Sequence, residues 1–264
     1  MHGRVVEWLG LRIVSGEFAA GSQLPNEADL AARLSVSRGG VREAIKALAA
    51  KGLVEPRPRL GTRVLSRPEW NLMDRDVIEW HGHAADVSFL GDLMELRLMV
   101  EPGAARLAAE RADEQQIATL EAAYAGMAAH ADQLPADENA FVEADLAFHL
   151  TVLRASGNQL VEQLGRLLET GLHHALEATS HLPGGVRATL PLHRAVLVAV
   201  KGGKPLAAER ALRRLLETTM DAIHNNARPV GSRTHGAGTG TGGADRSTAS
   251  VGRGARPAPT TGGG

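Results

Sequence analysis

Apolar residues recur at helical spacing along most of this chain, and turns divide its first stretch into short segments. The spacing predicts helices over residues 5–14, 27–34 and 38–51. Asn26 and Ser37 directly precede the second and third segments, and both residue types are favoured N-caps. We therefore expect a small helical unit at the start of the chain.

The third of these helices has one apolar and one basic side. Its apolar residues share one face at 3.6-residue spacing and are Val41, Ala44, Ile45 and Leu48. Arg38, Arg42 and Lys46 follow one another at four-residue spacing, and so they form a basic stripe on a different side.

A hairpin with a basic turn is predicted after the third helix. Short β-prone runs at 53–56 and 62–65 flank the basic segment 57–61. Two helices at a tight turn followed by such a hairpin predict a winged helix-turn-helix, whose third helix fits the major groove of B-DNA. The alternative is a small helical domain whose basic stripe is only a solvated surface.

The rest of the chain, after a connector at 67–83 that contains a short helix, has a purely helical pattern. Apolar residues at three- and four-residue spacing predict helices near 88–110, 114–131, 138–156, 158–180, 184–202 and 204–225. Strand patterns are absent, so we expect an antiparallel bundle of about six helices. Pro102 is expected either to kink the first of them or to mark a helix boundary.

Charge differs along the chain and supports a division into domains. Residues 1–66 hold ten basic and six acidic side chains, whereas 67–228 hold 15 basic and 23 acidic ones. We expect a mostly α-helical protein with a winged helix-turn-helix domain over 1–66 and a linker over 67–87. An all-α domain should follow over 88–228. Residues 229–264 are rich in Gly, Thr and Ser and should form a disordered tail.

Composition also excludes several classes of protein. The chain has no cysteine, which rules out a disulfide scaffold, a thiolate nucleophile and a thiolate zinc site. No apolar run approaches the length of a membrane span, and no signal-peptide core is evident at the start. A soluble cytoplasmic protein without a membrane partner is therefore expected.

Two groups of residues in the helical part could carry chemistry. Asp145 and His149 are four residues apart, and so they lie on one face of a helix. With His193 they could form a two-histidine, one-carboxylate metal site with open coordination positions. The alternative is a helix-surface Asp–His pair and an unrelated histidine, and spacing alone leaves both open.

The second group is Arg97 with Glu101, again four residues apart. The pair could be a surface ion pair that contributes a few tenths of a kcal/mol. Alternatively, Arg97 points into the bundle, where its planar guanidinium binds the carboxylate of a ligand.

The first 65 residues resemble a known family. The residues at 21–31, 36–44, 52–54 and 61–62 closely resemble the GntR family of bacterial transcription regulators, and the match covers essentially all of 9–65. The resemblance implies that the start of the third helix and the tip of the wing contact operator DNA. The residues expected on this DNA surface are Ser37, Arg38, Arg42, Lys46, Arg59, Gly61 and Thr62.

The helical part resembles the FCD effector domain of the FadR-type branch of that family, on the residues at 95–108, 145–158 and 193–200. Metal-binding members of the branch use an Asp and three histidines, and three of those positions are occupied here by Asp145, His149 and His193. The fourth position is Leu215 in this chain. The resemblance thus implies a possible divalent metal, such as zinc, held by three protein ligands, and a metal-free pocket stays open as well.

The linker at 70–80 and the residues at 100–102 resemble the sugar-acid-responsive repressors of this branch, particularly those of the D-galactonate type. This resemblance implies an aldonate effector that is bound by Arg97, Glu101 and Thr189. We expect a homodimeric repressor that releases a pseudo-palindromic operator when the effector binds, and not an enzyme. The alternatives are a metal-dependent enzyme acting on small hydroxy acids and a non-specific architectural DNA-binding protein.

Overall fold

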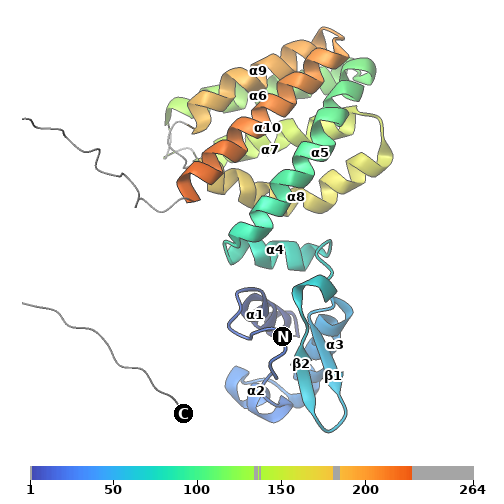
Figure 1. Cartoon of the computed structure of the whole chain (residues 1–264), viewed down its shortest axis with the longest axis vertical. Coiled ribbons are helices and arrows are strands. Elements are labelled where there is room, and N and C mark those ends of the chain that lie inside the picture. Colours follow the sequence, from blue (N-terminus) through green and yellow to red (C-terminus); the bar gives the residue numbers. More distant parts are fainter. Residues whose placement is uncertain (1, 134–135, 137, 181–184, 228–264) are drawn as a thin grey trace, which may run out of the picture. The chain divides into compact units, whose positions relative to one another are not determined.

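The structure is a computed structural model that describes residues 2–227 except 134–135, 137 and 181–184. Helices make up most of this part of the chain, and they accompany one two-stranded sheet (Figure 1). The mostly helical fold predicted from the sequence is thus confirmed. The prediction of a disordered tail at 229–264 concerns residues outside the described part.

The N-terminal unit consists of three helices and a hairpin. Its elements are α1 (His2–Val14), α2 (Glu27–Leu34), α3 (Arg38–Ala50), β1 (Val54–Arg57) and β2 (Gly61–Val64). The prediction places α2 and α3 within one residue of these bounds, whereas α1 begins three residues earlier than predicted. This order of elements is that of a winged helix-turn-helix.

Side-chain caps fix where α2 and α3 begin. The Asn26 side-chain oxygen accepts hydrogen bonds from the backbone N–H groups of Ala28 and Asp29 at 3.0 and 2.9 Å. The Ser37 hydroxyl accepts one from the N–H of Gly40 at 3.1 Å. These N–H groups belong to the first turn of each helix and have no partner inside it, so the two caps stabilise the starts of α2 and α3.

One apolar core joins the three helices and the hairpin. Its fully buried members include Leu9 and Ile13 of α1, Leu30 of α2, Val41 and Leu48 of α3, and Val64 of β2. The apolar face of α3 that was predicted from its spacing is therefore the face that packs inward.

β1 and β2 pair antiparallel, with Val54 opposite Val64 and Arg57 opposite Gly61. At the tip of this wing, Arg59 and Gly61 adopt positive φ values of 64° and 88°. Glycine is the residue that takes such a conformation at the lowest steric cost, and so Gly61 suits the tight end of the wing.

Beyond residue 86, the described part of the chain forms six α-helices, and a short 3-10 helix, Ala131–Gln133, follows the second of them. The α-helices are α5 (Val87–Arg111), α6 (Glu114–His130), α7 (Glu138–Ala155), α8 (Gln159–Ser180), α9 (Gly185–Lys201) and α10 (Pro205–Ala227). Each bound lies within two residues of its prediction. Pro102 does not mark a boundary, since α5 continues through it.

The six helices enclose two apolar cores. The larger core includes Phe148 and Val152 of α7 together with Leu212 of α10. The smaller core joins α5, α7 and α8, for example through Leu93 and Leu172. In Figure 1, α10 runs alongside α5, and the contacts between these two helices are extensive.

A further helix, α4 (Arg75–His83), belongs to the cores on both sides of it. Val77 and Trp80 are buried with side chains of α1 in the N-terminal core. Ile78 is instead buried with Leu93 and Leu172 in the smaller core of the bundle. The short helix predicted within the linker at 67–87 is thus present as α4, and it is packed on both sides.

The contact between α1 and α4 requires a glycine. A Cβ atom at Gly10 would lie 2.5 Å from the ring of Trp80, which is only 4% exposed and closely packed. We expect Gly10→Ala to lower the free energy of unfolding by about 1–3 kcal/mol, because overpacking forces the backbone or the ring to shift. Thermal and urea unfolding followed by circular dichroism would measure this.

Gly3 provides the matched control on the same helix, since a Cβ atom there meets nothing within 4 Å. Gly3→Ala should be neutral or stabilise the protein by about 0.5–1 kcal/mol, because alanine loses less conformational entropy in a helix. Equal effects of the two substitutions would contradict the close packing of α1 on Trp80.

Among the described helices, none is both long enough and apolar enough to cross a lipid bilayer.

Candidate functional site

The basic stripe of α3 faces solvent. The side chains of Arg38, Arg42 and Lys46 are exposed, while Val41 and Leu48 on the opposite face are fully buried. Lys46 pairs with Glu43 at 2.8 Å, and both side chains stay more than half exposed. The helix therefore offers its basic side to a ligand without disturbing the core.

Arg42 is held by a carboxylate of the neighbouring helix. Its Nη2 and Nε atoms donate to the two carboxylate oxygens of Glu27 at 2.8 and 3.2 Å. The hydrogen bond from Arg42 lowers the pKa of Glu27 below its usual value. This two-point contact orients the guanidinium at the surface of the helix-turn-helix. Sequence reasoning missed Glu27, because the pair depends on how α2 and α3 are arranged.

The wing presents Arg59 and the backbone of Gly61 at its exposed tip. Thr62 differs from the prediction, because the residue is only 9% exposed. Its carbonyl oxygen accepts a hydrogen bond from the N–H of Leu24 at 2.9 Å. Thr62 therefore holds the wing to the segment before α2, and its side chain is poorly placed to contact DNA.

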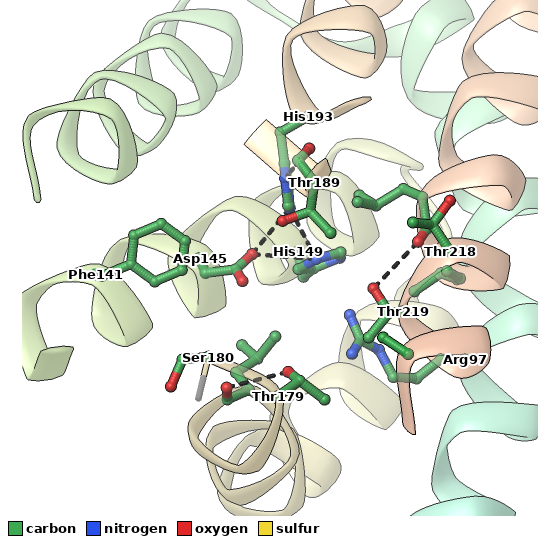
Figure 2. Close-up of a pocket in the computed structure, with 14 residues that line it drawn as sticks. Arg97, Phe141, Asp145, His149, Thr179, Ser180, Thr189, His193, Thr218 and Thr219 are labelled. Atoms are coloured by element: carbon green, nitrogen blue, oxygen red, sulfur yellow. Dashed lines mark hydrogen bonds and ion pairs between the residues drawn. The ribbon is translucent and has the colours of Figure 1, made fainter. Parts of the chain in front are cut away.

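A second potential site is a cavity of about 30 Å³ inside the bundle, formed by five helices (Figure 2). Its polar lining consists of Arg97 (α5), Asp145 and His149 (α7), Thr179 and Ser180 (α8), Thr189 and His193 (α9), and Thr218 and Thr219 (α10). Phe141, Leu176 and Leu215 are among the apolar residues around it. This volume holds about two water-sized probes.

Asp145, His149 and His193 converge at one end of this cavity. Asp145 Oδ1 lies 3.3 Å from His149 Nε2 and 3.0 Å from His193 Nε2, and the two Nε2 atoms are 3.4 Å apart. All three residues are at least 93% buried. The predicted grouping of one carboxylate and two imidazoles is therefore present in the structure, and Figure 2 shows the three side chains pointing toward one another.

The other ring nitrogens of both histidines already have partners. His149 Nδ1 lies 2.7 Å from Glu101 Oε2, and His193 Nδ1 lies 3.0 Å from the backbone oxygen of Thr189. Since both partners only accept, each Nδ1 carries a proton and donates, and each ring directs its Nε2 toward Asp145. Asp145 Oδ1 accepts no hydrogen bond of good geometry from the described residues.

These three buried atoms face one another, and each is of a type that can bind a metal ion. Ligands that bind one ion at about 2.1 Å lie about 3.0 Å apart at a right angle and about 3.4 Å apart at the tetrahedral angle. The observed separations of 3.0, 3.3 and 3.4 Å fit this range. Orientation of each histidine by a carboxylate or a carbonyl is also typical of metal ligands. A bound divalent ion would neutralise the cluster and offer open positions to ligand oxygens.

Electrostatics keep the surrounding carboxylates ionised. Burial alone raises the pKa of Glu101, but the charge of Arg97 and the contact with His149 outweigh burial and lower it to about 2. Burial likewise raises the pKa of Asp145, and the neighbouring His193 and His149 outweigh it and hold this pKa well below its usual value. The cavity thus contains negative charge close to buried cations.

Arg97 points into the bundle, as one of the two sequence interpretations predicted. It is 3% exposed, and its Nε donates to Glu101 Oε1 at 2.6 Å. Its Nη2 group is buried and has no hydrogen-bond partner among the described residues. Because an unpaired buried donor is costly, this group favours an anionic ligand in the cavity. Glu101 itself does not line the cavity, so the prediction that it contacts the effector gives way to a role in orienting Arg97 and His149.

Comparison with known proteins agrees with this arrangement. Residues 2–64 match the model of the bacterial regulatory proteins of the gntR family, and residues 92–218 match that of the FCD domain. The chain is 35% identical over 214 residues to the galactonate operon transcriptional repressor of Escherichia coli K12, which covers 79% of this chain and 90% of that protein. The chain belongs to the GntR family of bacterial regulatory proteins.

Other relatives of this GntR-family regulator are consistent with that assignment. It is 32% identical over 231 residues to the transcriptional repressor NanR of Klebsiella aerogenes, which covers 81% of this chain and 82% of NanR. The solved structure of Lar, which controls expression of the Listeria monocytogenes agr system, has a TM-score of 0.58 and 19% identity. It covers 85% of this chain and 97% of that chain, and it supports the fold alone.

Family membership decides between the classes of function. The GntR domain binds operator DNA and the FCD domain binds a small-molecule effector, and so the chain is a ligand-responsive transcription regulator. The alternatives of a metal-dependent enzyme and of an architectural DNA-binding protein are not supported, because the related proteins are transcription regulators.

Of the residues that line this FCD domain's cavity, Leu215 was identified from the sequence, but most of the hydroxyl groups were missed. Leu215, at the position of the family's fourth metal ligand, lines the cavity and is buried, and so it leaves one side of the metal-ligand cluster apolar. Apart from Thr189, the hydroxyl groups that line the cavity were missed: Thr179, Ser180, Thr218 and Thr219. Thr219 follows Leu215 by one helical turn, and this spacing was the available signal.

Proposed function

We propose that this GntR-family regulator is a repressor that binds a pseudo-palindromic operator as a homodimer and releases it when a sugar acid related to galactonate enters the FCD cavity. The observation that carries the proposal is Arg97, a buried guanidinium whose Nη2 group has no partner among the described residues. It faces the same cavity as the Asp145–His149–His193 cluster (Figure 2).

The chemistry of the cavity suits a polyhydroxy carboxylate. The planar guanidinium of Arg97 can donate two parallel hydrogen bonds to the two oxygens of a carboxylate. Neither a neutral sugar nor an amine carries such a pair of charged oxygens. The hydroxyls of Thr218 and Thr219 each donate to a backbone carbonyl, at 2.8 and 3.1 Å, and keep lone pairs that can accept from ligand hydroxyls. The resemblance to the galactonate operon repressor supports an aldonate as the effector.

A divalent metal fits the same proposal. Asp145, His149 and His193 would hold it, and its remaining positions would face the effector's carboxylate or hydroxyl oxygens. With three protein ligands and Leu215 beside them, the affinity for metal should depend on whether effector oxygens complete the coordination.

The size of the cavity supplies the basis for a switch. A volume of about 30 Å³ is too small for a six-carbon acid, so binding requires the lining helices to move apart. Because α5 lines the cavity through Arg97 and also contacts α4, where the ring of Phe89 stacks on His81, movement of α5 can reach the N-terminal core. By linkage, operator DNA must then weaken effector binding by the same factor.

The proposal is tested by titrating D-galactonate and related aldonates against the protein bound to fluorescent operator DNA. We expect the wild type to release the operator, and Arg97→Lys to need about 10-fold or more effector, because lysine keeps the charge but loses the planar fork. Release is measured by fluorescence anisotropy, and direct binding of the acid by isothermal titration calorimetry.

Thr219→Val is the companion variant, since it removes one hydroxyl from the cavity at nearly constant volume and leaves Arg97 and its partner in place. It should weaken the response several-fold. Operator affinity without effector should be unchanged in both variants, which shows that they fold. An operator complex that no aldonate dissociates, with or without added zinc, would refute the proposed switch.

A further inference from the structure

A second pocket of about 390 Å³ lies between α4, α5 and α8. Its walls are mostly apolar and include Phe89, Leu90, Leu93 and Ala175. It shares no lining residue with the effector cavity and is far larger. A pocket of this volume with mainly apolar walls and few polar groups is typical of sites for small molecules.

One polar group in this pocket is buried without a partner. His81 is 1% exposed, and its Nδ1 lies 3.0 Å from Asp86 Oδ2. Its ring stacks on Phe89, with ring centres 4.4 Å apart and planes at 8°. Its Nε2 is buried and has no hydrogen-bond partner among the described residues.

The protonation of His81 defines what its Nε2 can bind. The carboxylate of Asp86 only accepts, and so Nδ1 carries a proton and donates. Burial lowers the pKa of His81 and outweighs the contrary influence of Asp86, which keeps the ring neutral near pH 7. Nε2 is then a buried acceptor, and it needs an O–H or N–H donor to avoid the cost of an unmade hydrogen bond.

We propose that this pocket is a second ligand site, which takes a small, neutral, largely apolar ring compound carrying one hydroxyl or N–H donor for His81 Nε2. The apolar walls bind the ring, and the unpaired Nε2 of His81 fixes its orientation. The ligand class therefore differs from the anionic, polyhydroxylated effector proposed for the cavity beside Arg97. The inference does not depend on that effector assignment.

The probe for the test is 2-naphthol, a neutral bicyclic ring with one hydroxyl, and its matched partner is 2-methoxynaphthalene, which lacks the donor. We expect calorimetry on the full chain to give one site per chain for 2-naphthol and about 3–10-fold weaker binding of the ether, since one neutral hydrogen bond is lost. His81→Phe keeps the ring stack and removes the acceptor, and so it should bind both probes equally.

Leu90→Trp fills part of the pocket from its partly exposed wall and should weaken 2-naphthol binding about 10-fold or more. The control is Leu160→Trp, at a leucine that is 77% exposed and outside the pocket; this variant should bind like the wild type. Two comparisons do not depend on whether His81→Phe folds: 2-naphthol against its ether on the wild type, and Leu90→Trp against Leu160→Trp.

The proposal fails if the wild type does not bind 2-naphthol, if the ether binds equally well, or if Leu90→Trp has no effect. Failure also follows if Leu90→Trp changes the sedimentation of the protein while the wild type binds no probe, because a second copy would then cover the pocket. Arg97→Lys should keep full affinity for 2-naphthol, which separates this site from the effector cavity. Loss of 2-naphthol binding in Arg97→Lys would show that the probe binds in the effector cavity and would contradict the proposal.

Discussion

Arg42→Ala is expected to abolish recognition of the specific operator while leaving non-specific DNA binding nearly intact. Arg42 is exposed on the basic side of α3, and its guanidinium is already oriented by two hydrogen bonds from its nitrogens to Glu27. An arginine presented in this way can donate two bonds to a guanine in the major groove, and losing such a contact costs about 10-fold or more per half-site. Anisotropy titrations with operator and with scrambled DNA measure both affinities.

Two variants test that interpretation. Arg106→Ala removes an exposed arginine from α5 that belongs to the bundle, and operator affinity should not change. Glu27→Gln keeps Arg42 but removes its charged partner. We expect this variant to reduce, but not abolish, the difference in affinity between operator and scrambled DNA. If Arg42→Ala weakened binding to both DNAs equally, the residue would contact phosphate and not bases.

The helices of this regulator could be predicted closely, because their signals are local. N-caps such as Asn26 and Ser37, and the apolar spacing of α3, depend only on neighbouring residues. The convergence of Asp145 and His149 followed from their four-residue spacing. Their grouping with His193 could only be suggested from the sequence, with an unrelated histidine left open, since 44 residues separate the two histidines.

Contacts between elements far apart in sequence could not be predicted. The pair of Arg42 and Glu27 depends on the angle between two helices, and the burial of Thr62 depends on the segment that covers the wing. Glu101 illustrates the same limit. Its spacing from Arg97 predicted their ion pair, but not the hydrogen bond between His149 and the second carboxylate oxygen of Glu101. Whether a polar side chain faces a cavity or supports one that does is decided by packing.

Asp145→Ala is expected to remove tight metal binding from the FCD domain. In the wild type, Asp145 Oδ1 and the Nε2 atoms of His149 and His193 lie within 3.4 Å of one another, and we expect them to bind one zinc ion per chain. Without the carboxylate, two neutral imidazoles remain, and we expect affinity to fall about 100-fold or more, since even supporting residues of metal sites change it 10–100-fold. Calorimetry with a competing chelator measures the change.

Three further variants make this test specific to the cavity. Glu101→Gln should weaken zinc about 10-fold or more by loosening the orientation of His149, and Leu215→His should strengthen it by adding a fourth ligand. His173, His174 and Glu177 form a separate group of potential metal ligands. His173→Ala removes one of them and should leave the tight binding of zinc unchanged. If zinc binding instead disappeared with His173, the acceptors around Asp145 would hold no metal, and Arg97 alone would have to bind the effector.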